Sequence, residues 1–253
     1  MAHAHGHHGH AHPGHAHPHA SRRRLSLVLG LTLGFLVIEV AAGLLTGSLA
    51  LLADAGHMLT DAAGLLLALL AMKIAERPPS PRRTFGYHRA EVLAALTNAV
   101  LLLGVAGYIL REAWDRFRDP QPVPGGAVVA VAAAGLLVNV AGALMLRSGS
   151  KTSLNLRGAY NEVVADALSS VGVILGALLM AATGWHRVDT LVAVAIALFV
   201  LPRTWALLRE TLHVLLEGTP REVDLQALRQ AMEGVPGVKT VHDLHVWTLT
   251  SGV

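Results

Sequence analysis

The sequence predicts an all-α membrane protein with six transmembrane helices and a small appended segment at its C-terminal end. Hydrophobic residues make up 53% of the 253 residues and charged residues only 15%, against about 25% in an average soluble domain. The mean hydropathy is +0.51, and the apolar residues occur in runs too long for the core of a soluble globule. These observations argue against a soluble protein and exclude disorder for most of the chain.

Six apolar runs predict the membrane helices. Each run is close to or longer than the roughly 20 residues that a helix needs to cross about 30 Å of hydrocarbon. At this composition only helices satisfy their own backbone hydrogen bonds in lipid. The predicted helices cover Leu25–Leu45, Leu49–Ile74, Ala90–Leu110, Val123–Leu146, Ala159–Thr183 and Val188–Leu208.

Residues 1–21 differ in composition from the rest of the chain. They are mostly His, Ala, Gly and Pro, which cannot pack a core, so we expect a disordered cytoplasmic arm. Neutral imidazole is a good ligand for zinc, nickel and copper. The arm is therefore a candidate metal collector, and the alternative is a biased tail with incidental metal affinity. Its candidate ligands are His3, His5, His7, His8, His10, His12, His15, His17 and His19.

The distribution of Lys and Arg predicts the orientation in the membrane. With the N-terminus inside, the cytoplasmic segments carry most of the basic residues, as the positive-inside rule requires. We therefore expect both termini in the cytoplasm and a charged outer loop over residues 111–122. The cytoplasmic basic residues are Arg22, Arg23, Arg24, Lys73, Arg77, Arg82, Arg83, Arg89, Arg147, Lys151 and Arg157, and the outer ones are Arg111, Arg116, Arg118 and Arg187.

We expect residues 22–210 to form the transmembrane domain and residues 211–253 a partial cytoplasmic domain. In the second range, Asp224 can cap a helix over LQALRQAME, which Gly234 ends. The stretch VKTVHDLHVWTLT then alternates in the manner of a strand. One helix and one strand are too small to bury a core. We expect this piece either to dock on something else or to belong to a longer domain.

The composition also excludes several functions. The chain has no cysteine, so it has no disulfide, thiolate metal site or cysteine nucleophile. No nucleophile–base constellation, phosphate-binding glycine loop or cofactor motif is present, and we expect no enzymatic activity. The formal charge of +3 and the pI near 9.7 do not indicate a nucleic-acid partner, because the arginines sit beside apolar runs.

Four polar residues inside the predicted helices form the candidate metal site. His57 and Asp61 belong to the second helix, and Glu162 and Asp166 belong to the fifth. Each pair is spaced i, i+4, which places both side chains on one helical face. Charged groups inside a membrane are costly and usually functional. Two such faces turned toward each other offer four N and O ligands, the usual arrangement for zinc.

The alternative for these four groups is a purely structural role as hydrogen-bond or ion-pair partners between helices. One weak cation cannot balance three acids, which argues against it. Asp54 lies one turn before His57 and is a candidate supporting or mouth residue, and a further candidate ligand. The two pairs lie at different depths in the predicted helices, so we expect the fifth helix either to begin before Ala159 or to have a displaced inner end.

Four stretches of the sequence carry a family resemblance: SLALLADAGHMLTDAAGLLLALLA, RRTFGYHRAEVLAALTNA, NLRGAYNEVVADALSSVGVI and GVKTVHDLHVW. Together they resemble the cation diffusion facilitator family, in particular its bacterial zinc, cobalt and cadmium resistance exporters. The resemblance extends from Arg22 to Val253. It implies a homodimeric, proton-coupled exporter of divalent metal in the lipid bilayer of the bacterial inner membrane. It also implies a cytoplasmic domain of ferredoxin-like α/β fold, which is only partly present here.

The resemblance implies a transport site made of His57, Asp61, Glu162 and Asp166. Many zinc-transporting members have His where this chain has Glu162. Three carboxylates make a harder and more anionic site. We therefore expect Zn²⁺ as the substrate, with Co²⁺, Cd²⁺ and Ni²⁺ as further possibilities.

The resemblance also implies roles outside the membrane. In some members the loop between the second and third helices binds metal, and here it offers His88, one position from where a ligand is expected. A regulatory metal ligand of other members is matched by His242. Arg89 and Glu217 match an ion pair that links the third helix to the cytoplasmic domain in the family, and the alternative is a solvated surface pair of little energetic value.

We expect metal to enter from the cytoplasm between the second and fifth helices and to leave outward by alternating access. Metal binding requires deprotonated ligands, so protons and metal exchange at the site. Two rival hypotheses are a non-transporting membrane scaffold that binds or senses metal, and a monovalent cation–proton exchanger. His57 and the His-rich arm argue against the exchanger.

Overall fold

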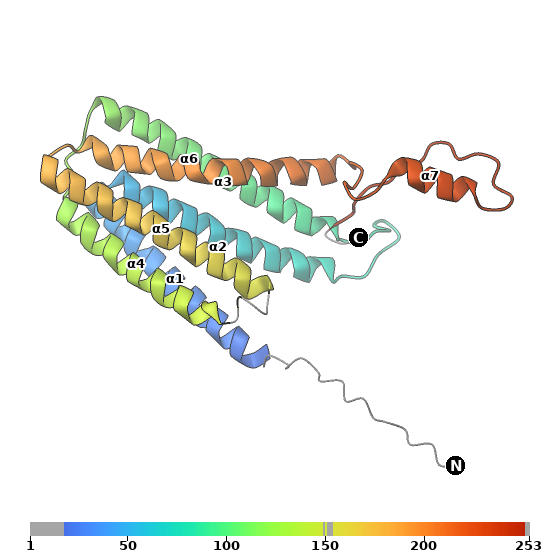
Figure 1. Ribbon diagram of the computed structural model, residues 1–253, viewed down its shortest axis with the longest axis horizontal. Coiled ribbons are helices and arrows are strands. Elements are labelled where there is room, and N and C mark those ends of the chain that lie inside the picture. The colour runs from blue at the N-terminus through green and yellow to red at the C-terminus, as the bar shows by residue number, and fades with distance from the viewer. Residues whose placement is uncertain (1–17, 149, 151–153, 251–253) are drawn as a thin grey trace, which may run out of the picture.

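The computed structural model describes residues 18–148, 150 and 154–250. Within these residues the chain forms six long helices and one short helix (Figure 1). They are α1 (Pro18–Thr46), α2 (Leu49–Ala75), α3 (Arg89–Arg118), α4 (Gly125–Arg147), α5 (Leu154–Thr183), α6 (Arg187–Leu215) and α7 (Leu225–Glu233).

The six long helices lie alongside one another in one bundle, and α7 projects beyond one end of it (Figure 1). α4 packs mainly on α5, and α3 packs mainly on α6. α2 contacts α1, α3, α5 and α6, and it therefore connects the two halves of the bundle. The α2–α3 loop and α7 lie toward the same end (Figure 1).

Each of the helices α1 to α6 is long and apolar enough to cross a membrane. Large apolar side chains such as Leu45, Leu137 and Phe199 are exposed on the outer faces of the bundle. A soluble monomer rarely exposes contiguous apolar surface on this scale, whereas hydrocarbon accommodates it. The described chain is therefore an integral membrane protein.

Small residues allow the helices to approach closely, as is usual in membranes. A Cβ atom added to Gly135 of α4 would lie 2.5 Å from Cζ of Phe35 in α1. At the α5–α6 contact, a Cβ added to Gly176 would lie 2.5 Å from Cγ2 of Val192. The two glycines thus set how closely these pairs of helices pack.

α3 continues to Arg118, so the prediction of an outer loop is wrong for residues 111–118. Side-chain contacts explain the longer helix. Arg116 Nε donates to Glu112 Oε1 at 2.8 Å, and the Arg118 guanidinium lies 4.5 Å from the centre of the Trp114 ring. Such contacts between residues four apart stabilise a helix beyond the end of its apolar run.

Other boundaries also differ from the predictions. α5 begins at Leu154, which confirms the expectation that it starts before Ala159. α6 continues to Leu215, past the predicted end at Leu208. α1 begins at Pro18 and overlaps the expected arm over residues 1–21. The histidines from His3 to His17 lie outside the described residues, and for His19 the structure gives only its place in α1.

The helix predicted after Asp224 is confirmed as α7. Asp224 caps it, because Oδ1 accepts from the backbone N–H groups of Gln226 at 2.8 Å and Ala227 at 3.2 Å. The predicted strand is wrong, since residues 238–250 pair with no strand in the part of the chain that the structure describes. An alternating pattern needs a neighbouring strand to satisfy its backbone. The ferredoxin-like α/β fold stays a prediction.

Candidate metal site

His57, Asp61 and Glu162 come together between α2 and α5 and form the one group of three candidate metal ligands found among the described residues. One ligand atom from each lies within 4.8 Å of the other two. His57 Nε2 lies 3.4 Å from Asp61 Oδ2 and 3.9 Å from Glu162 Oε1. The side chains are partly buried, so an ion could reach them and still be largely enclosed.

Asp166 lies one turn farther along α5 and outside this group of three. Its side chain is buried, with only 4% of the residue exposed. Asp166 Oδ1, His57 Nδ1 and Asp61 Oδ2 are buried without a hydrogen-bond partner in the described chain. Buried polar atoms nearly always have a partner. The donor set of imidazole and carboxylates therefore fits a bound cation.

The offset of α2 against α5 brings the two pairs to one depth. The helices start at opposite ends of the bundle (Figure 1). At 1.5 Å per residue, α2 extends about 27 Å beyond His57, and α5 extends about 32 Å beyond Glu162 in the opposite direction. His57 and Glu162 lie at different distances from the ends of their helices, and this offset brings them beside each other.

Asp189 of α6 fixes the start of α2, two turns before the site. The first four N–H groups of a helix have no acceptor within it. Asp189 Oδ2 accepts from the backbone N–H groups of Leu49 at 2.6 Å and Ala50 at 3.3 Å. The Thr46 hydroxyl accepts from the N–H of Ser48 at 3.3 Å, and the Ser48 hydroxyl accepts from the N–H of Leu51 at 3.2 Å. Asp189 Oδ1 also accepts from the Ser48 hydroxyl at 2.5 Å. All four groups are satisfied, so the position of α2 is set by α6.

Arg203 of α6 contacts the site and is not among the site residues predicted from the sequence. Its Nη1 donates to Glu162 Oε1 at 3.3 Å and to Oε2 at 3.1 Å, and its Nη2 donates to Oε2 at 3.2 Å. The signal was present in the sequence, because Arg203 stands inside an apolar run. An ionisable residue at such a place is a functional candidate by default.

Asp54 does not belong to the group of three ligands. It is buried, and its Oδ1 accepts from the Ser169 hydroxyl of α5 at 2.6 Å. It also interacts electrostatically with Glu39 of α1, which is equally buried. Asp54 thus ties α2 to its neighbours beside the site, and a supporting role for it in metal binding stays a prediction.

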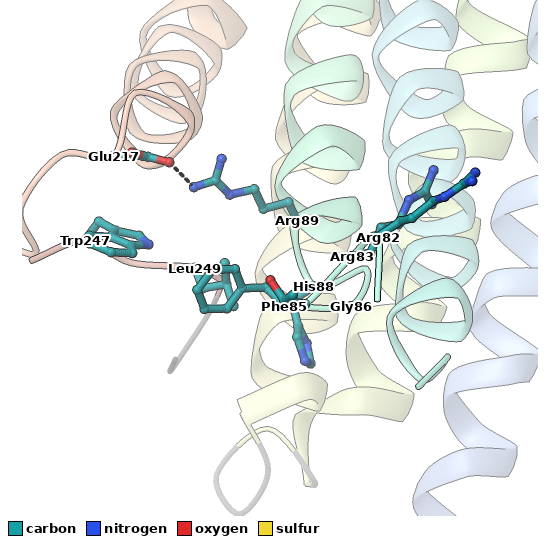
Figure 2. Close-up of a pocket in the computed structure, with 10 residues that line it drawn as sticks. Arg82, Arg83, Phe85, Gly86, His88, Arg89, Glu217, Trp247 and Leu249 are labelled. Carbon is teal, nitrogen blue, oxygen red and sulfur yellow. Dashed lines mark hydrogen bonds and ion pairs between the residues drawn. The ribbon is translucent and has the colours of Figure 1, made fainter. Parts of the chain in front are cut away.

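A pocket of about 350 Å³ lies between the α2–α3 loop and the C-terminal segment (Figure 2). Across it, Arg89 Nη2 donates to Glu217 Oε1 at 2.7 Å, which confirms the predicted ion pair. His88 lines the same pocket with Arg82 and Arg83. The arginines make this environment unfavourable for a metal cation.

His242 is exposed in the C-terminal segment, and its Nδ1 lies 3.1 Å from Asp243 Oδ2. Neither His88 nor His242 belongs to a group of three candidate ligands in the described part of the chain. Metal binding by either residue stays a prediction.

The fold and the site together define an integral membrane protein of six helices that holds a candidate divalent-cation site between two of them. A family model described as the cation efflux transmembrane domain matches residues 25–216. A second, described as the cytoplasmic domain of cation efflux proteins, matches residues 220–253. The chain therefore belongs to the cation diffusion facilitator family, as the sequence motifs predicted.

Curated relatives cover most of the chain. The metal cation efflux system protein CzcD of Cupriavidus metallidurans is 52% identical over 232 residues, 92% of this chain and 73% of the relative. The zinc transporter ZitB of Escherichia coli K12 is 45% identical over 249 residues, 98% of this chain and 78% of the relative. The cadmium, cobalt and zinc/H(+)-K(+) antiporter of Bacillus subtilis is 41% identical over 222 residues, which are 87% of this chain and 71% of the relative.

Proposed function

We propose that this protein exports divalent metal cations, with Zn²⁺ as the main substrate, in exchange for protons. The observation that carries the proposal is the group of His57, Asp61 and Glu162 inside the membrane-spanning bundle. Metal efflux is further supported by the match to the cation efflux transmembrane domain and by relatives named as a metal cation efflux protein and a zinc transporter.

The ligand separations are close to those of a tetrahedral zinc site. Zn–N and Zn–O bonds of about 2.0–2.2 Å place neighbouring ligand atoms roughly 3.4 Å apart. His57 Nε2 and Asp61 Oδ2 already have this separation, at 3.4 Å. Glu162 Oε1 lies 3.9 Å from His57 Nε2, and a small rotation brings it into range. Asp166, one turn along α5, is the fourth ligand in this proposal.

Proton coupling follows from the chemistry of the ligands. Imidazole and carboxylate bind metal only when deprotonated, so metal binding expels protons. When the site opens outward, incoming protons displace the metal from the same atoms. Alternating access, with the site open to one side of the membrane at a time, then uses the proton gradient to drive metal out of the cytoplasm.

The carboxylates also bear on the range of metals. Three carboxylates and one imidazole form a site dominated by oxygen donors, which does not select zinc alone. Co²⁺, Cd²⁺ and Ni²⁺ are therefore further substrates in this proposal. The relative from Bacillus subtilis is named for cadmium, cobalt and zinc.

The working unit in this proposal is a homodimer in the bacterial inner membrane, with both termini in the cytoplasm. The family model that matches residues 220–253 bears the short name ZT_dimer, which supports dimerisation. The domains are a metal-collecting arm over residues 1–21, a transmembrane domain over 22–210 and part of a ferredoxin-like domain over 211–253.

Reconstitution into proteoliposomes tests the function. Vesicles with entrapped pH and zinc indicators are given Zn²⁺, Co²⁺ or Na⁺, and metal uptake and proton efflux are followed together. Asp61→Ala is expected to abolish both fluxes. The control, Asp119→Ala, removes an exposed carboxylate outside the bundle and is expected to leave them unchanged.

The rival functions give different results in the same assay. Flux that depends on Na⁺ would indicate a monovalent exchanger, and metal binding without any flux would indicate a scaffold. Normal exchange of Zn²⁺ for protons in both Asp61→Ala and Asp166→Ala vesicles would contradict the proposed site.

A further inference from the structure

Arg203 places a fixed positive charge on a carboxylate that the proposed function assigns to the metal. Its Nη1 lies 3.3 and 3.1 Å from the two oxygens of Glu162, and its Nη2 lies 3.2 Å from Oε2. A guanidinium that spans both oxygens makes the strong, geometrically specific form of this pair. Arginine stays protonated in proteins, so the charge is present whenever the contact forms.

Arg203 and a metal ion compete for the position of Glu162. His57 Nε2 and Asp61 Oδ2 are 3.4 Å apart, the spacing of roughly 3.4 Å expected around zinc. Glu162 Oε1 is farther away, 3.9 Å from His57 Nε2, and it accepts from Arg203. To bind a metal together with His57 and Asp61, Glu162 has to loosen its contact with Arg203.

The charges of the site point the same way. Asp61, Glu162 and Asp166 carry three negative charges when ionised, and Arg203 reduces the sum to two. That sum is equal and opposite to the charge of one divalent ion. A divalent cation interacts with the carboxylates twice as strongly as a monovalent one at the same distance. This difference favours displacement of the guanidinium by a divalent cation over displacement by a monovalent one.

We propose that Arg203 is a specificity-determining residue of the site: its guanidinium occupies Glu162 while the site is empty and yields the carboxylate only to a divalent cation. This inference rests on the proposed function and deepens it. Because the displaced charge stays nearby, Arg203 lowers the affinity for metal. Weaker binding in turn favours release after transport.

The exposure of the pair allows this exchange. The Arg203 side chain is 73% exposed and the Glu162 side chain 27% exposed. The long arginine side chain is not packed inside the bundle, so its charged head can turn away from Glu162. The guanidinium can therefore withdraw without leaving an unpaired charge buried in the bundle.

The test is the Zn²⁺ concentration at half-maximal transport by the full-length protein in proteoliposomes. Arg203→Gln removes the charge and is expected to lower this concentration at least tenfold, which corresponds to about 1.4 kcal/mol. Arg203→Lys keeps the charge, so its half-saturating concentration is expected to stay within about threefold of wild type, or about 0.65 kcal/mol. Arg209→Gln removes an exposed charge from the same helix away from Glu162 and serves as the control.

The sign of the change separates the possible roles. If Arg203 merely orients Glu162, both Arg203→Gln and Arg203→Lys raise the half-saturating concentration, and that result would overturn the inference. An unchanged value in Arg203→Gln would overturn it as well. Na⁺ at 100 mM is expected to inhibit Zn²⁺ uptake in Arg203→Gln more than in wild type. A wild-type protein that transports no divalent metal would refute the proposed function itself, a result distinct from the other two.

Discussion

The contact between Asp189 and the start of α2 gives the sharpest prediction for stability. Asp189→Ala leaves the N–H groups of Leu49 and Ala50 and the hydroxyl of Ser48 without their acceptor. Asp189 is buried, and each orphaned buried donor costs about 1–3 kcal/mol. Allowing for relaxation, we expect the free energy of unfolding to fall by about 3 kcal/mol. At about 2–4 °C per kcal/mol for a chain of this size, the melting temperature falls by roughly 6–12 °C.

The assay is thermal unfolding of the purified protein in detergent, followed by intrinsic tryptophan fluorescence. Asp189→Asn keeps an acceptor oxygen and is expected to lose about half as much as Asp189→Ala. Asp119→Ala removes an exposed carboxylate just after α3 and is the control. A melting temperature of Asp189→Ala within about 2 °C of wild type would refute the account of how α2 is anchored.

Three other predictions concern packing, selectivity and the arm. Gly135→Ala places a Cβ 2.5 Å from Phe35 Cζ and is expected to destabilise the protein by about 1–3 kcal/mol. The control is Gly104→Ala, whose new Cβ has nothing within 4 Å. Equal melting temperatures of the two variants would contradict the packing described. Glu162→His replaces a hard ligand by imidazole and is expected to raise Zn²⁺ transport relative to Co²⁺ and Cd²⁺ in an uptake panel; an unchanged ratio would show that Glu162 does not set selectivity. Deletion of residues 2–20 is expected to weaken apparent metal affinity a few-fold without stopping turnover, and complete loss of transport would contradict a collecting role for the arm.

Hydrophobic runs in the sequence predicted the helices well because lipid leaves the backbone few alternatives. The hydrophobic runs predicted the ends of the helices less well. At the end of α3, Glu112 and Arg116 extend the helix through side-chain contacts that a hydropathy pattern does not register. The strand predicted over residues 238–250 was wrong for a different reason. An alternating sequence pattern alone does not supply the neighbouring strand that a β-strand needs.

The site was predictable where its residues share a helical face. The i, i+4 spacing of His57 and Asp61 and the position of Glu162 were enough to expect three candidate ligands in one place. The contributions of Arg203 and Asp189 depend on how α6 packs against α5 and α2, which no local pattern reveals. Both are ionisable residues in an apolar segment, and that signal alone would have marked them as candidates.

The central claim is that α2 and α5 bind the same divalent ion. Titration of Co²⁺ into protein lacking residues 2–20, followed by visible absorption, tests it without competition from the arm. We predict one tetrahedral Co²⁺ per chain and loss of the same spectrum in Asp61→Ala, on α2, and in Glu162→Ala, on α5. A spectrum that survives either substitution unchanged would show that the two helices do not share the ion.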